Sequence, residues 1–408
     1  MHAGEIEIGA LREEEIGIFA QLMSEGFGLQ YTAVRGILLA DPYYDLKNKR
    51  VLRVAGRVVS CLTIIDTQCW IGQSLVSLAG VAGVATWERE RRQGYAGKLL
   101  ENTLALLYRR GYALSALIPF SSEYYRKFGW EIGSTICRYQ LLPRHLNPYS
   151  EWRNLRSATL DDIPALQSLY NAQAMGRAFQ CLRDHRRWQY LLAMVKQSLV
   201  YETPNEGVTG YLFYEFRQQE EGYPVLRVVE MEAIAQEAER GPCGFLAMQE
   251  RVASIEWDAG AGELPRLLCH LKHVGDPLPG VALLPGIMSR IVHLPNLLEA
   301  LVVEWHGFRG MLALGISDPF SEEGFAAVRI TGDGERCRYE SISEEEVLLA
   351  PHSLIGEVRA WSQVLTGYVE WQNACSLGLL KASSAVAMEY AGMLFPTRLP
   401  FLPPADHF

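Results

Sequence analysis

The sequence predicts an α/β (α+β) protein in which helices and mixed strands alternate over two or three domains. Residues 75–86 form an apolar run rich in Val, Ala and Gly that is short enough for a buried strand. A basic, glycine-containing turn follows, and from Gly94 to Gly111 the apolar residues have helical spacing. The chain of 408 residues is too long for one ordinary domain, and a similar pattern restarts near Thr159.

Composition and charge limit the functions that this fold can serve. With 49% hydrophobic and 21% charged residues the chain is typical of a soluble globular protein, and its net charge of −9 argues against wholesale nucleic-acid binding. A negative chain attracts cationic substrates. The first residues lack the basic and apolar regions typical of a signal peptide, no apolar stretch is long enough to span a bilayer, and the eight cysteines are scattered without a CxxC pair. We therefore expect a cytoplasmic protein with reduced thiols and no membrane span.

The first part of the chain is predicted as one unit of helices around a sheet. Apolar residues at helical spacing predict a helix over 11–24, which ends at Gly26. The elements that follow are strands over 51–62 and 74–86 with a short strand or turn over 66–73 between them, a helix from Gly94 to Gly111, a strand over 113–118, a helical turn over 121–128 and a strand over 130–141.

The turn between the strand and the helix is the first candidate site. Its residues, Arg91-Arg92-Gln93-Gly94-Tyr95-Ala96, place backbone N–H groups and a helix N-terminus beside two arginines. Such a turn binds anions, because the helix dipole and the free N–H groups favour negative charge. We therefore predict a phosphate-ester site here, although strand, glycine turn and helix are also a common way to pack an α/β unit.

The rest of the chain is predicted to repeat this unit and then to change. After a linker with Pro143 and Pro148, a helix begins near Ile163. Residues 236–244 stand where a second phosphate turn belongs, but Glu237 and Glu239 would repel a pyrophosphate and Pro242 lacks an N–H donor. We therefore predict a degenerate second copy without cofactor. The other expected elements are paired strands over 208–217 and 223–235, a Pro- and Gly-rich boundary over 277–286, strands over 301–316 and 324–331, and helices over 351–365 and 383–393.

Three segments of the sequence together resemble the GNAT acetyltransferases, a superfamily that uses acetyl-CoA. They are Gly83-Val84-Ala85-Thr86, the turn Arg91-x-x-Gly94-x-Ala96, and Tyr124-Tyr125-Arg126-Lys127-Phe128-Gly129-Trp130. With its length and its C-terminal Phe, the whole chain resembles the enhanced-intracellular-survival (Eis) type of these enzymes. That resemblance implies two tandem GNAT folds, each with a mixed, splayed central sheet and flanking helices, and a sterol-carrier-like α+β domain. The implied domains are 1–148 (catalytic, acetyl-CoA-binding), 149–284 (degenerate) and 285–408, whose C-terminus enters the active site.

The resemblance also implies which residues carry the reaction. Tyr125 would be the general acid toward the departing thiolate, and the α-carboxylate of Phe408 would act as base or proton relay. A carboxylate with a pKa of about 3.5 is a weak base, so we expect relay through water and orientation of a cationic amine. Glu25, Asp406 and His407 are candidate substrate contacts, and no metal is expected.

Acetyl-CoA, the implied co-substrate, is expected between two strands of the first unit. If the strands over 75–86 and 113–118 splay apart, pantetheine can lie in the gap like an added strand, and the turn can hold the pyrophosphate. The loops over 26–45 are expected to shape the acceptor pocket, and a proline-rich tail would carry Phe408 across to this unit. The implied acetyl-CoA contacts are Val84, Ala85, Thr86, Arg91, Arg92, Gln93, Gly94, Tyr95, Ala96, Gly97, Phe120 and Ser121.

These observations predict an acetyl-CoA-dependent N-acetyltransferase that acts on a small molecule with a primary amine, with aminoglycosides the class that the resemblance favours. A protein lysine or a polyamine is an alternative acceptor. A non-enzymatic protein that binds lipid or another small molecule through its third domain is an alternative of a different class. Taken singly, Tyr125 could be a packing tyrosine, Phe408 a frayed end, and His270 with His273 a surface pair rather than metal ligands. The resemblance further implies a ring-like homo-oligomer such as a hexamer.

Overall fold

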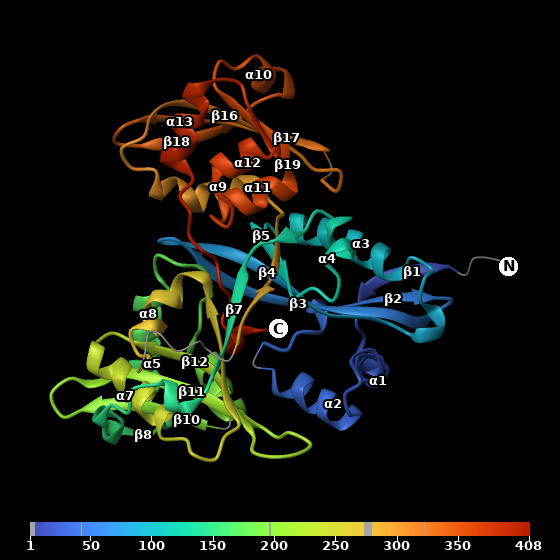
Figure 1. The fold of residues 1–408 in the computed structure, drawn as a ribbon. Coiled ribbons are helices and arrows are strands. Elements are labelled where there is room, and N and C mark those ends of the chain that lie inside the picture. The colour runs from blue at the N-terminus through green and yellow to red at the C-terminus, as the bar shows by residue number, and fades with distance from the viewer. Residues whose placement is uncertain (1–4, 42, 196, 273–279, 322) are drawn as a thin grey trace.

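The computed structural model describes residues 5–41, 43–195, 197–272, 280–321 and 323–408. Their strands form three sheets, and each sheet with its helices is called a unit below. Figure 1 shows the third unit above the other two units, which lie side by side. The C-terminus ends between these two, at the end of the red tail that descends from the third unit. Within the described ranges, no helix is long and apolar enough to cross a membrane.

The first unit is built around a long antiparallel hairpin, β3 (Arg57–Ile71) and β4 (Ser74–Thr86). Its sheet has the order β1-β2-β3-β4-β5-β15-β6, with β9 paired to β3. β4 and β5 are parallel, and α3 connects them as the helical spacing predicted. The predicted short strand over 66–73 is the end of β3 instead, because the hairpin pairs continuously from Thr63 to Ile71. The other elements are β1 (Ile6–Ala10), β2 (Lys49–Val54), β5 (Leu114–Leu117), β6 (Glu131–Ile132), β9 (Ala178–Cys181), β15 (Met288–Ile291), α1 (Ile16–Phe27), α2 (Tyr31–Ala40), α3 (Tyr95–Arg109) and α4 (Ser122–Arg126).

The second unit repeats this plan, as the sequence predicted. Its sheet has the order β14-β7-β13-β12-β11-β10-β8, and β11 and β12 form the predicted antiparallel pair. β12 and β13 are parallel and α7 connects them, so the residues that replace the phosphate turn are helical, with Pro242 inside the helix. The elements are β7 (Thr135–Leu141), β8 (Leu155–Ser157), β10 (Gln197–Thr203), β11 (Gly207–Arg217), β12 (Val225–Ala233), β13 (Ser254–Gly260), β14 (Gly280–Pro285), α5 (Ile163–Ala174), α6 (His185–Met194), α7 (Gln236–Ala247) and α8 (Leu264–Leu268).

The third unit has a sheet of order β18-β17-β16-β19-β20. Two predictions for it were wrong. The strand expected from Leu301 begins only at Arg309, because Leu294, Leu297 and Leu301 share one face of a helix, α9. The helix expected from Pro351 begins only at Val358, after a strand that pairs in parallel with β16. The elements are β16 (Arg309–Ser317), β17 (Phe325–Asp333), β18 (Cys337–Ser341), β19 (Ser353–Glu357), β20 (Leu380–Ala382), α9 (Leu294–Leu301), α10 (Glu344–Leu349), α11 (Val358–Leu365), α12 (Trp371–Ser376) and α13 (Ala385–Leu394).

Short 3-10 helices join elements in all three units. Two of them, η3 and η9, lie at the candidate site described below. The full set is η1 (Glu13–Glu15), η2 (Leu46–Asn48), η3 (Glu88–Glu90), η4 (Pro143–His145), η5 (Ser150–Asn154), η6 (Leu160–Asp162), η7 (Ala261–Glu263), η8 (Val302–Glu304) and η9 (Pro404–Asp406).

The chain crosses between the first two units at two adjacent places. The strand predicted over 130–141 is divided, since β6 stays in the first sheet while β7 pairs with β13 in the second. In return, β14 pairs with β7, and β15 pairs with β5 and β6. At the crossing, the Ile287 N–H donates to Ser134 Oγ at 2.9 Å and the Gly133 N–H donates to the Ile287 carbonyl at 2.9 Å. The first two sheets therefore contain strands from both sides of the predicted domain boundaries near 148 and 284. Those boundaries stay a prediction. Pro277, Pro279 and His273 lie outside the described residues.

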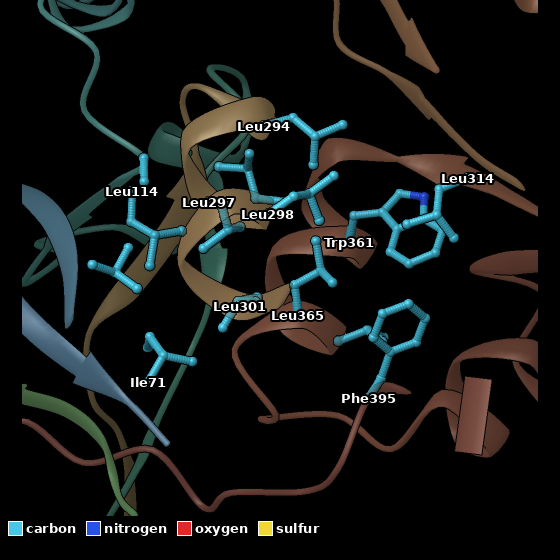
Figure 2. Packing of buried hydrophobic residues seen from close by; sticks show 14 of the residues in the cluster. Ile71, Leu114, Leu294, Leu297, Leu298, Leu301, Leu314, Trp361, Leu365 and Phe395 are labelled. Atoms are coloured by element: carbon cyan, nitrogen blue, oxygen red, sulfur yellow. The ribbon is translucent and has the colours of Figure 1, made fainter. Parts of the chain in front are cut away.

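One continuous apolar core joins the first and third units. Figure 2 shows the leucines of α9 between Ile71 and Leu114 of the first sheet on one side and Trp361 on the other. Phe395, where the C-terminal tail begins, packs in the same core. Because interior side chains pack at nearly crystalline density, the tail starts from a fixed point. Five of the cysteines are buried, as expected for core thiols: Cys61, Cys69, Cys137, Cys181 and Cys243.

Candidate active site

A notch opens between β4 and β5 in the first sheet. The two parallel strands pair from Leu78 with Leu114 to Gly80 with Ala116. β4 then continues to Thr86, and among the described residues no strand pairs with that edge. On its other edge β4 pairs with β3. The register of that pairing shifts at Gly83 of β4, whose φ is 60°. The predicted splay is therefore present, and the open edge of β4 offers backbone groups to an extended ligand.

The predicted phosphate turn lies at the wide end of this notch. Arg92 has φ 66° and Gly94 has φ 79°, so the chain turns sharply before α3 begins at Tyr95. No side chain of the described residues caps this helix, so the N–H groups of its first turn stay available. Arg91 and Arg92 are exposed beside them. This nest of N–H groups with two cations fits a pyrophosphate.

The remaining predicted cofactor contacts surround the notch. The Ala85 side chain is buried beneath α1, so only its backbone can reach a ligand, and Thr86 Oγ1 pairs with Ser60 Oγ at 2.9 Å. A Cβ at Gly97 would lie 3.2 Å from the Phe128 ring, so helix and ring pack closely there. Phe120 is 71% exposed, and Ser121 Oγ caps α4 by accepting the Tyr124 N–H at 3.3 Å.

Tyr125 lies in a cluster of aromatic rings after β5. Its ring centroid is 5.2 Å from that of Phe120, 5.3 Å from that of Tyr124 and 6.3 Å from that of Trp130, all with edge-on geometry. Burial raises the pKa of the Tyr125 phenol, and Tyr124 adds to the rise. The phenol is therefore protonated at neutral pH and can donate its proton.

The C-terminal tail, residues 395–408, descends from the third unit and ends between the other two units (Figure 1). The Phe401 N–H donates to the Ala178 carbonyl at 3.1 Å, and Gln180 Nε2 donates to the Phe401 carbonyl at 2.7 Å. A Cβ at Gly260, at the end of β13, would lie 3.0 Å from the Phe401 Cβ. The tail is thus held by backbone and side-chain contacts along its length.

A buried ion cluster fixes the tail close to its end. Arg183 is fully buried, and its guanidinium donates to both Asp406, at 2.8 Å, and Glu230 of β12, at 2.7 Å. It also stacks 3.9 Å from the ring centroid of Tyr170. Burial by itself lowers the pKa of Arg183, but Asp406 and Glu230 raise it well above its ordinary value. Arg183 therefore stays charged, and it ties the second unit to the residues just before Phe408.

The tail also occupies the region of the second unit that corresponds to the notch. β12 and β13 pair from Val225 to Val228, and past that point η9 lies against β12. At the N-terminus of α7, Glu239 pairs with Arg266 and approaches His270 Nε2 at 3.4 Å. This acidic helix and the tail together give a physical reason for the prediction that the second unit holds no cofactor.

Phe408 itself lies where the first notch begins to open. A Cβ at Gly80 would lie 2.8 Å from Cε2 and Cζ of the Phe408 ring. Gly80 is also the last β4 residue that pairs with β5. The ring of Phe408 therefore lies beside the vertex of the notch, and only a residue without a side chain leaves it room there.

A cavity of about 460 Å³ adjoins the terminal residue. It contains two of the predicted substrate contacts, Asp406 and His407, but not Glu25, which is exposed on α1 and accepts from Gln21 at 3.4 Å. Tyr125 is not among its lining residues. The lining residues are Met23, Phe27, Leu29, Ile37, Leu38, Asp41, Tyr43, Lys49, Thr63, Ile64, Ile65, Asp66, Thr67, Ala82, Gly83, Cys181, Leu182, Arg187, Tyr190, Asp406, His407 and Phe408.

Sequence reasoning located part of this cavity and missed the rest. The segment over 26–45 does line it, although residues 31–40 are a helix rather than a loop. Phe27, which lies between two glycines at the end of α1, and Leu29, which follows the second glycine, were a local signal for a binding surface. Arg183 and Arg187 carried no such signal, because their partners in the tail are more than two hundred residues away in sequence. Within the described ranges, no group of three or more His, Cys, Asp or Glu side chains is placed to hold a metal ion.

Comparisons with known protein families match two segments of the chain. Residues 7–133 match a family described as an acetyltransferase (GNAT) domain, and residues 180–291 match a second family with the same description. A comparison with curated protein sequences found no match. The two matched segments correspond to the first two units.

Solved structures match the whole chain. A GCN5-related N-acetyltransferase from Anabaena variabilis ATCC 29413 superposes with a TM-score of 0.84 at 19% identity over 99% of this chain and 100% of that chain. A probable N-acyltransferase from Enterococcus faecalis V583 gives 0.81 at 19% identity with the same coverage. Eis1 from Mycobacterium abscessus gives 0.74 at 18% identity, again over 99% and 100% of the two chains. At these identities the likeness establishes the fold.

Proposed function

We propose that this chain, whose fold comprises two tandem GNAT domains and a third unit, is an N-acyltransferase that uses acetyl-CoA to acylate a primary amine. The observation that carries the proposal is the position of Phe408. The last residue of the chain lies at Gly80, where the notch of the first GNAT domain opens and where the cavity begins. We attribute to a terminal carboxylate near this position a role in the reaction rather than in the stability of the fold.

The notch and the turn are the proposed cofactor site. The open edge of β4 from Ala82 to Thr86 would pair with pantetheine, and the N–H groups after Gly94 with Arg91 and Arg92 would hold the pyrophosphate. Acetyl-CoA supplies a thioester-activated acetyl group: the N–C bond forms, the C–S bond breaks, and one proton passes from the amine to the sulfur. The exposed ring of Phe120, next to the Tyr125 ring, would shield the thioester from water.

Two groups of the chain would move the protons. The Tyr125 phenol, kept protonated by burial, would donate toward the sulfur. The Phe408 carboxylate would attract the ammonium form of the acceptor and pass its proton to water, because a carboxylate with a pKa of about 3.5 is too weak a base to hold it. This division assigns the acid to Tyr125 and the proton relay to Phe408.

The second GNAT domain would act as a scaffold rather than a second site. Arg183 holds Asp406, and Arg187 Nη2 donates to the Ala405 carbonyl at 2.9 Å. Both contacts act on the two residues before His407, so they set the position of the terminal carboxylate. One working site per chain is the consequence.

The remaining expectations stay predictions. They are the sterol-carrier-like character of the third unit and the ring-like hexamer. The predicted acceptor is an aminoglycoside, a protein lysine or a polyamine. The assay that tests the reaction also tests which of these acceptors is acetylated.

The experiment is thiol release from acetyl-CoA by the untagged protein in the presence of a panel of amines, with the acetylated product identified by mass spectrometry. Amine-dependent thiol release with a matching acetylated product supports the proposal. Thiol release that no amine accelerates would refute it, and lipid binding by such an inactive protein would favour the non-enzymatic alternative.

A further inference from the structure

We infer that the acceptor is a monoamine whose single positive charge sits on an apolar body, such as an alkylamine or an arylalkylamine. The inference rests on the proposed function and concerns the cavity beside Phe408. Two independent features of the cavity carry it: uncovered apolar side chains at its mouth and a charge balance that leaves one carboxylate without a cation.

The apolar feature comes from α1 and α2. Phe27 and Leu29 are each 50% exposed and Ile37 is 47% exposed, yet all three line the cavity. Deeper in the cavity Met23 and Leu38 continue the same surface. A ligand that covers these side chains removes apolar surface from water, which favours binding in proportion to the area covered. A polyhydroxylated body would leave its own hydroxyl groups unpaired against them.

The charge balance comes from four carboxylates of the lining residues, those of Asp41, Asp66 and Asp406 and the α-carboxylate of Phe408. Asp41 Oδ2 lies 3.5 Å from Lys49 Nζ, so these two charges offset each other. Asp406 is held by Arg183 at 2.8 Å, and Arg187 approaches it at 3.5 Å. Neither carboxylate is therefore free to bind a second cation.

Asp66 lines the cavity through its strand but turns its carboxylate away. Side chains alternate along β3, and Thr63, Ile65 and Thr67 share the opposite face from Ile64 and Asp66. The Asp66 carboxylate accordingly accepts a hydrogen bond from Tyr112, a buried residue of the core behind the sheet.

The terminal carboxylate of Phe408 is the one that remains. Among the ion pairs of the described residues, none involves it. One carboxylate accommodates one ammonium group, whereas a polycation would bring further charges close to Lys49 and Arg187, which also line the cavity. A monoamine with an apolar body satisfies both features at once.

The test compares kcat/KM for four amines with the untagged protein: ethylamine, phenethylamine, spermidine and kanamycin. A phenyl group that covers the exposed side chains is expected to raise kcat/KM by about 50-fold over ethylamine. Spermidine and kanamycin are expected to fall below phenethylamine by at least about tenfold. A higher kcat/KM for either polycation would overturn the inference while leaving the proposed function intact; no thiol release with any amine would refute both.

Two surface variants locate the effect. Leu29→Ser and Ile37→Ser are each expected to raise the KM for phenethylamine about tenfold more than the KM for ethylamine, since the apolar body covers these positions. Leu39→Ser is the matched control, because Leu39 lies on the same helix, is 59% exposed and does not line the cavity. Equal effects of Ile37→Ser and Leu39→Ser, or none from either cavity variant, would overturn the inference.

Discussion

The substitution Gly80→Ala probes the position of the terminal residue with the smallest possible change. Gly80 lies inside β4 and its φ is not positive, so an alanine fits the strand backbone. The added Cβ would lie 2.8 Å from two ring atoms of Phe408, about 0.6 Å inside an ordinary contact of 3.4 Å. The tail is the movable partner, because Phe408 belongs to no helix or strand, whereas Gly80 is held in the sheet. The ring and the attached carboxylate must therefore shift.

A shift of this size is expected to matter for catalysis far more than for stability. Misplacing a reacting group by about 1 Å costs up to about 100-fold in rate, so we expect kcat/KM to fall by roughly 10-fold to 100-fold. The free energy of unfolding should change by no more than about 1 kcal/mol, because glycine-to-alanine changes in compatible backbone are small. The assay is thiol release from acetyl-CoA with a saturating amine, together with urea unfolding of the same samples.

A second substitution tests the stated cause. Phe408→Leu removes the ring atoms that collide while keeping the terminal carboxylate, so the double variant Gly80→Ala with Phe408→Leu should regain most of the activity of Phe408→Leu alone. Full activity in Gly80→Ala, or no recovery in the double variant, would show that the ring does not lie at Gly80 in the working protein.

Three further predictions concern the acid, the phosphate turn and the tail. Tyr125→Phe should lower kcat by about 100-fold or more and leave the KM for acetyl-CoA nearly unchanged, because the ring keeps its packing; an unaltered kcat would remove Tyr125 from the reaction. The double substitution of Arg91 and Arg92 by Glu should raise the KM for acetyl-CoA at least about tenfold, less so in high salt, whereas Arg89→Glu, 74% exposed outside the turn, should not. The pKa of His407 is lowered in the folded protein, chiefly through burial. As the pH falls below about 6.5, His407 therefore takes up a proton in the unfolded chain before it does so in the folded protein. The free energy of unfolding should therefore decline between pH 7 and pH 5, and His407→Gln should show a smaller decline; equal declines would contradict the assignment.

The local elements of the fold were predictable from sequence, and the crossings between units were not. The strand before Arg91 and the helix after Gly94 were confirmed because each has its own periodicity and its own turn chemistry. The segment over 130–141 was misassigned because an alternating strand pattern is the same whichever sheet the strand joins. The chain crosses at Gly133 and Ser134. Their role there is visible only from their contacts with residues near Ile287.

The site divides in the same way. The turn and Tyr125 were predicted from short motifs, and the role of Phe408 was predicted from the resemblance of the whole chain; these roles stay predictions. The charge pattern of the cavity was not predictable, since Lys49, Asp406 and Arg183 come from three distant stretches that only the tertiary fold brings together. The tail anchor shows the same limit, because an arginine in mid-sequence gives no sign that it binds a residue near the C-terminus.

The central claim is that the last residue of the chain belongs to the acyl-transfer site of the first GNAT domain. The most direct measurement compares thiol release from acetyl-CoA by the untagged protein and by a protein extended after Phe408 with a short Gly-Ser segment. We predict that the extension abolishes amine-dependent thiol release while the unfolding transition stays in place, because the α-carboxylate is lost and the cores are untouched. Full activity in the extended protein would contradict the claim.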